Sequence, residues 1–172
     1  MRRLRMAAVL TVATLAAACG DLFSLHALYT ADDRVLDPAI EGVWHDDDDI
    51  VIVARNGDGN DYRMTLVNKH KPTETAAYEV HLVDIAGARF ADLIQEDAIG
   101  HMIVRGRVAD GKLRFAFFDS KWLRDRVPHE EASSGFGPAR NVLTIRTSEL
   151  RELVARYANE PKAFDEETVF HR

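Results

Sequence analysis

The chain has 172 residues, 47% of them hydrophobic and 29% charged, which is typical of one globular domain and excludes a disordered or fibrous chain. Its formal charge is −6, and because residues 1–18 hold three arginines and no acid, the rest of the chain carries −9. An acidic chain repels nucleic-acid phosphates and gains nothing from anionic lipid head groups. We therefore expect no nucleic-acid partner and no electrostatic binding to membranes.

Residues 1–18 have the organisation of a secretion signal. Three arginines lie within the first five residues, an apolar run covers 6–15, and three alanines at 16–18 precede Cys19. The apolar run is too short to span a bilayer, which takes about 20 apolar residues. The sequence therefore predicts a signal peptide over 1–18 and export of the remaining chain.

Cys19 is the only cysteine in the chain, so no intramolecular disulfide explains it. Small residues followed by this cysteine resemble the lipobox of bacterial lipoproteins, in which the cysteine is acylated, with palmitate for example, and then becomes the first residue. Ala16 stands where the lipobox favours leucine, so ordinary signal cleavage near Ala18 is the alternative. The resemblance implies lipidation at Cys19, and Gly20 after it implies the outer membrane of the bacterial cell envelope, facing the periplasm. Two or more acyl chains are sufficient for stable attachment.

Residues 19–39 are predicted to be a lipidated N-terminus and tether, and residues 40–172 a single β-rich globular domain. The tether is more apolar than a free linker, so we expect it to lie along the domain or the membrane surface. Seven runs in the domain have the composition and spacing of short strands: 41–45, 50–55, 62–66, 78–82, 90–94, 101–108 and 113–118. Tight turns between them, such as Asp110-Gly111, predict an antiparallel meander.

The meander ends at Asp119, which caps a predicted short helix near 119–126. A long loop follows over 129–141, and residues 142–145 are predicted to form an eighth strand. A second helix is predicted near 148–158, because its apolar residues fall on one face: Leu150, Leu153, Val154 and Tyr157. The tail to Arg172 has no clear pattern.

Gly42-Val43-Trp44 opens the first strand, and eight strands with a closing helix follow. This arrangement resembles the lipocalin and calycin group of barrels. The resemblance implies a mainly β fold, either a closed barrel or a strongly curved sheet. It also implies that Trp44 lies under the barrel floor, with Arg146 or Arg114 stacked across it. The order from lipobox to final helix further resembles small uncharacterised bacterial lipoproteins, a likeness that implies no activity.

The clearest polar cluster is His45 followed by four aspartates at 46–49. Carboxylates bind calcium, but adjacent side chains on a turn point apart, which favours a solvated loop. Residues 56–61 resemble an EF-hand loop only superficially, because its sixth position is Asp61 rather than glycine. The seven histidines lack zinc-ligand spacing. We therefore predict no metal and no cofactor.

His129 lies near Ser133 and Ser134 in a glycine-rich loop, but a nucleophile elbow between strand and helix is missing. A hydrolase is thus the least favoured hypothesis, and we expect a non-enzymatic protein without catalytic residues.

Phe115 and Phe117 alternate with Phe118, so this strand is apolar on both faces. That pattern indicates a helix packed outside or an apolar cavity inside. The sequence thus predicts an envelope lipoprotein that binds a small apolar ligand or an envelope protein. The alternative is a structural or assembly-accessory lipoprotein with a filled barrel, acting through the 119–141 insertion.

Overall fold

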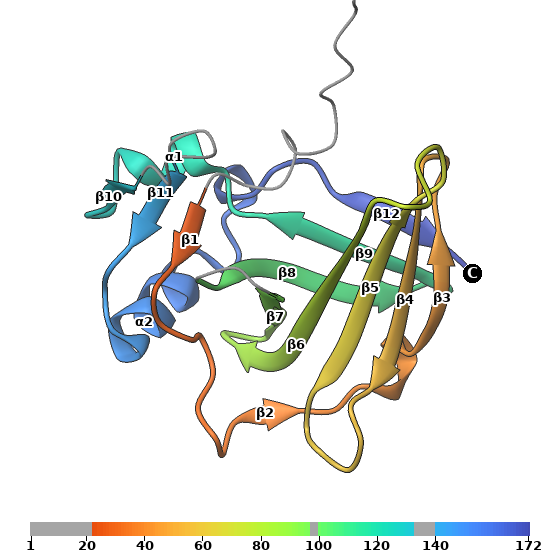
Figure 1. The fold of residues 1–172 in the computed structure, drawn as a ribbon. Coiled ribbons are helices and arrows are strands. Elements are labelled where there is room, and N and C mark those ends of the chain that lie inside the picture. The colour runs from red at the N-terminus through yellow and green to blue at the C-terminus, as the bar shows by residue number, and fades with distance from the viewer. Residues whose placement is uncertain (1–21, 97–99, 133–139) are drawn as a thin grey trace, which may run out of the picture.

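The computed structural model describes residues 22–96, 100–132 and 140–172, and it is mainly β. Its largest feature is an antiparallel sheet that closes on itself through the pairing of β6 with β7 (Figure 1). The eight strands of the ring are β3 (Gly42–His45), β4 (Asp49–Arg55), β5 (Tyr62–Asn68), β6 (Thr75–Ile85), β7 (Ala88–Gln95), β8 (Met102–Ala109), β9 (Lys112–Phe117) and β12 (Thr168–His171). The predicted lipocalin-like barrel is confirmed.

Tight turns connect the strands of the meander as the sequence predicts. Asp110 and Gly111 both have positive φ, 53° and 69°, which is the conformation that a two-residue hairpin turn requires. Ala86 and Gly87 form a second turn of this kind between β6 and β7, with φ of 51° and 77°. Consecutive strands from β3 to β9 are therefore neighbours in the sheet.

The strand that closes the ring differs from the one predicted. Residues 142–145 were expected to supply it, but β11 (Arg140–Leu143) lies in a separate sheet with β1 (Leu22–Ser24) and β10 (Glu130–Ala132). The C-terminal β12 closes the barrel, pairing with β9 over four residues and with β3 through His171 and His45. Both segments have strand composition, and only β12 places an aromatic side chain, Phe170, in the inner core.

The described part of the predicted tether, residues 22–39, belongs to the fold. β1 pairs in parallel with β11, and Leu28 is fully buried. β2 (Arg34–Val35) pairs with β6 at Val83 and Leu82, beyond the last residue of β6 that pairs with β5. The short helix η1 (Pro38–Ile40) then leads into β3.

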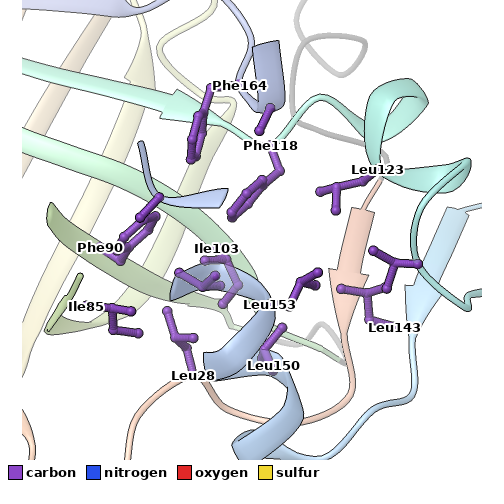
Figure 2. Packing of buried hydrophobic residues seen from close by; sticks show 14 of the residues in the cluster. Leu28, Ile85, Phe90, Ile103, Phe118, Leu123, Leu143, Leu150, Leu153 and Phe164 are labelled. Carbon is purple, nitrogen blue, oxygen red and sulfur yellow. The ribbon is translucent and has the colours of Figure 1, made fainter. Parts of the chain in front are cut away.

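A hydrophobic core lies outside the barrel, between its β6–β8 face and the two helices (Figure 2). Helix α1 (Ser120–Arg124) begins after Asp119, whose carboxylate accepts hydrogen bonds from the Lys121 and Trp122 amides. Helix α2 (Thr147–Tyr157) buries Leu150, Leu153 and Val154. Both helices occupy the predicted regions. Each large apolar side chain buried here contributes about 1.5–3 kcal/mol. The short helix η2 (Pro161–Ala163) connects α2 to β12.

A buried carboxylate ties the N-terminal segment to the barrel. Asp92 on β7 is completely inaccessible, and its Oδ2 accepts a hydrogen bond from the Leu28 amide at 2.7 Å. Its Oδ1 lies 2.8 Å from Nδ1 of His101, which donates because a carboxylate only accepts. Asp92 therefore satisfies two donors that burial would otherwise leave without a partner.

We predict that Asp92→Asn lowers the free energy of unfolding by about 2–3 kcal/mol, because a neutral amide does not replace two charge-assisted hydrogen bonds. Urea unfolding measures the change, and hydrogen exchange of the Leu28 amide reports local release of the segment. Asp58→Asn, on an exposed turn, is the control with the same charge change. Equal stability of the two variants would contradict a role for Asp92 in holding this segment.

Candidate functional site

The barrel encloses a cavity of about 750 Å³. Alternate residues of the strands point inward and form its wall, as pairs two residues apart: Val51 and Val53, Met64 and Leu66, Val80 and Leu82, Ala91 and Leu93, Met102 and Val104, Phe115 and Phe117. Two inward positions, Ala91 and Gly106, add little volume. Eight-stranded barrels are either filled by side chains or hold one small ligand, and the volume of this cavity is within the range of ligand pockets.

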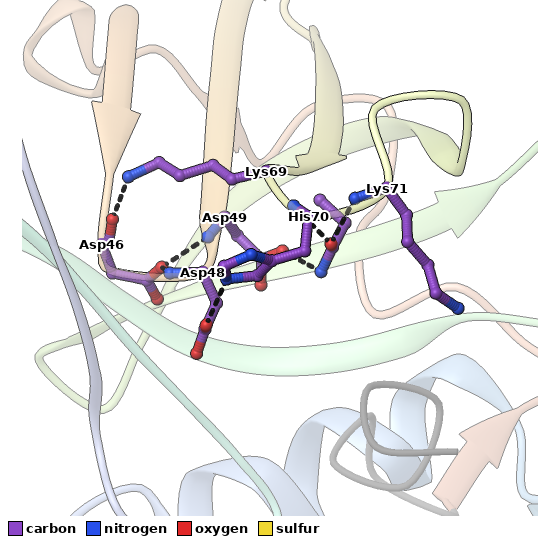
Figure 3. Close-up of polar contacts among 7 residues, drawn as sticks. Asp46, Asp48, Asp49, Lys69, His70 and Lys71 are labelled. Carbon is purple, nitrogen blue, oxygen red and sulfur yellow. Dashed lines mark hydrogen bonds and ion pairs between the residues drawn. The ribbon is translucent and has the colours of Figure 1, made fainter. Parts of the chain in front are cut away.

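Two turns form the mouth of the cavity, the one between β3 and β4 and the one between β5 and β6 (Figure 3). Asp46 organises the first turn, because its Oδ1 accepts hydrogen bonds from the amides of Asp48 at 2.9 Å and Asp49 at 2.7 Å. Asn68 organises the second, because its Oδ1 accepts from the amides of His70 and Lys71 at 2.9 and 3.0 Å. Each turn is therefore fixed by a local side chain.

Side-chain contacts also join the two turns to each other. Asn68 donates from Nδ2 to Oδ1 of Asp49 at 3.1 Å, and His70 Nε2 lies 3.1 Å from Oδ1 of Asp48. The Lys69 ammonium donates to the Asp46 carbonyl (Figure 3). The acidic run of the sequence thus stands at the rim of the cavity. Within the described ranges, no three His, Cys, Asp or Glu side chains are placed to hold a metal ion.

Asp49 is the buried member of the acidic run. It is 8% exposed and lines the cavity at the start of β4, on the same face of that strand as Val51. Burial raises its pKa, and the neighbouring Asp46 carboxylate raises it further, while the hydrogen bond from Asn68 acts in the opposite direction. The ionised form of Asp49 is therefore less favourable in the folded chain than in water.

We predict that Asp49→Asn increases the free energy of unfolding at neutral pH. A raised pKa in the folded state means that the ionised carboxylate destabilises the fold above that pKa, whereas an amide carries no charge and still accepts from Asn68. The gain should shrink as the pH falls through the raised pKa and vanish below an ordinary aspartate pKa of about 3.9. Denaturant titrations across this pH range measure it. A gain that is constant with pH would contradict the assignment.

The opposite end of the cavity is closed near η1. Arg89, at the start of β7, donates to Oδ2 of Asp37 at 2.9 Å and also forms an ion pair with Asp84. The Tyr62 hydroxyl, which is buried, accepts from the Asp37 amide at 2.7 Å. Two carboxylates thus neutralise the cation at this end, and Ile40 of η1 covers it.

Trp44 lies in the inner core next to η1, and its indole nitrogen donates to the Ile40 carbonyl at 2.7 Å. The cation over its ring is Arg172, whose guanidinium carbon is 4.6 Å from the ring centroid and which donates to the Ala39 and Glu41 carbonyls. Gly42, which opens the strand, has a φ of +132°, a conformation that other residues rarely adopt.

The arginine stacked on Trp44 is Arg172, whereas the sequence analysis expected Arg146 or Arg114. Arg146 is exposed at the start of α2, where its amide donates to Glu149 at 3.0 Å, and Arg114 pairs with Glu167. Because His171, the last residue of β12, pairs with His45, the chain brings Arg172 next to Trp44. Residues 168–171, Thr-Val-Phe-His, do not alternate between polar and apolar types, so no local pattern predicted this strand.

The other residues that the sequence analysis singled out do not line the cavity or are not among the described residues. Cys19, Ser133 and Ser134 lie outside the described residues. The Nδ1 atom of His129 contacts the Val127 carbonyl at 3.1 Å. A cluster that sequence reasoning missed joins Asp92 and His101 with the buried His81, whose ring is 3.9 Å from that of Tyr29 by centroids. Their sequence separation of up to 72 residues leaves no local signal.

No family model, curated protein or solved structure matches the chain. The link to lipocalin-like proteins is therefore one of architecture, namely the closed eight-stranded antiparallel barrel and the tryptophan–arginine pair at one end. A shared architecture of this kind carries no function with it.

Proposed function

We propose that this chain is a non-enzymatic lipoprotein of the bacterial cell envelope that binds one small apolar ligand inside its barrel. The observation that supports the proposal is the cavity of about 750 Å³ with walls of aliphatic and aromatic side chains. A ligand that buries its apolar surface against such a lining gains about 25 cal/mol of binding free energy for each Å² removed from water. The alternative is a structural or assembly-accessory lipoprotein that acts through residues 119–141. It requires a filled barrel, which the cavity does not support.

A second part of the proposal concerns attachment. The small residues before Cys19 support its acylation, and Gly20 supports placement at the outer membrane. Only two residues separate Cys19 from β1, so a lipid there holds the β1–β11–β10 sheet within about 11 Å of the attachment point. The described segments contain no helix long and apolar enough to cross a membrane. The acyl chains would therefore supply the membrane affinity.

We predict that Ala91→Trp abolishes ligand binding, because an indole on the inner wall occupies the cavity. Fluorescence titration with the neutral apolar probe N-phenylnaphthylamine should show at least a tenfold loss of affinity, with an unfolding temperature that is unchanged or raised. Ala54→Trp is the matched control, since Ala54 is exposed and lies next to Val53, which faces the cavity. Failure of the unmodified protein to bind the probe, or equal binding by the folded Ala91→Trp variant, would refute binding inside the barrel.

We predict that Cys19→Ala releases the protein from membranes and abolishes incorporation of labelled palmitate. The acidic domain offers no other affinity for anionic head groups, so fractionation should move from the membrane pellet to the soluble fraction. Retention of the variant in the membrane fraction would disprove anchoring by a lipid on this residue.

A further inference from the structure

The charges along the cavity are unevenly paired. Two arginines, one lysine and one histidine line it, and each has a carboxylate partner: Arg89 with Asp37 and Asp84, Arg107 with Glu167, Lys71 with Glu74, and His70 with Asp48. Among the described lining residues, no cation is therefore left to receive an anionic ligand.

Two carboxylates of the lining lack such a partner. Neither Asp46 nor Asp49 forms an ion pair with any described residue, and the ammonium of Lys69 in the second turn donates to the Asp46 backbone carbonyl. Asp46 uses its Oδ1 to hold its own turn. Asp49 is more than nine-tenths buried and borders the apolar wall, with a single hydrogen bond from Asn68 at its Oδ1. Among the described carboxylates that line the cavity, Asp49 is the buried one without an ion pair.

We propose that the ligand is a cationic amphiphile, an apolar chain or ring system carrying a protonated amine, and that Asp49 binds the ammonium group at the cavity mouth. This inference rests on the proposed function and specifies its ligand class. The apolar part lies along Val51, Leu66 and the other wall residues, and the ammonium donates to the carboxylate of Asp49. A charge-assisted hydrogen bond is stronger than a neutral one.

The same geometry disfavours a fatty acid. A carboxylate at the mouth meets Asp46, Asp48 and Asp49 and finds no unpaired cation among the described lining residues. Like charges repel more strongly in a partly buried site than in open water. At the other end Arg89 is already neutralised by two carboxylates. An uncharged alcohol avoids the repulsion but makes only a neutral hydrogen bond to Asp49. The order of affinity is therefore amine, alcohol, carboxylate for one and the same apolar chain.

The test displaces bound N-phenylnaphthylamine with decylamine, decanol and decanoate at pH 7 and physiological salt, below their micelle concentrations. We expect decylamine to compete at a concentration about tenfold lower than decanol, and decanoate to be the weakest. Asp49→Asn should bring decylamine level with decanol, and its retained fold is checked by its unfolding curve. Asp58→Asn, which removes one exposed charge from the far hairpin turn, should keep the tenfold preference.

The outcomes separate the two proposals. If the unmodified protein does not bind the probe, ligand binding in the barrel fails. If it binds the probe but decanoate competes as well as decylamine, the barrel binds ligands and the cationic class is wrong. If Asp58→Asn removes the preference as fully as Asp49→Asn, the selectivity comes from net charge and the assignment to Asp49 is overturned.

Discussion

Closure of the sheet into a ring determines where the other side chains of the domain lie. A closed antiparallel sheet leaves no open edge among its eight strands and forces alternate residues to face a common interior. The closure depends on β12, which comes from the end of the described chain and joins β9 to β3. The same pairing places Arg172 over Trp44. One short strand therefore closes the barrel and positions the arginine that covers Trp44 beside η1.

Where the barrel wall packs against the helices, both its inner face and its outer face are apolar. On β9 the inward residues Phe115 and Phe117 face the cavity, whereas the following Phe118 belongs to the outer core with Phe90 and Phe164. Both explanations for an apolar strand therefore hold at once in this fold. The outer core buries the outer face of this wall, while the inner face lines the cavity.

Polar groups are confined to the two ends of the cavity, and the two ends differ. Arg89 at the closed end has more than enough negative charge around it, whereas Asp49 at the mouth has too little positive charge. Burial raises the pKa of Asp49, and the neighbouring Asp46 carboxylate raises it further. If the proposal is right, a ligand that brings a cation to the mouth relieves this unfavourable burial, and the residue that costs the fold stability is also the one that would select the ligand.

The sequence by itself determined the β meander, its turns and the two helices, because hydrophobic alternation and turn or cap residues such as Asp110-Gly111 and Asp119 act over a few neighbours. It also indicated Trp44 as a residue of the barrel end. Only the tertiary structure decided that β12 closes the ring, that Arg172 covers Trp44, and that the barrel is hollow with Asp49 at its mouth. These features depend on pairings between distant segments and on how much volume the inward side chains leave, and neither is encoded in a local pattern.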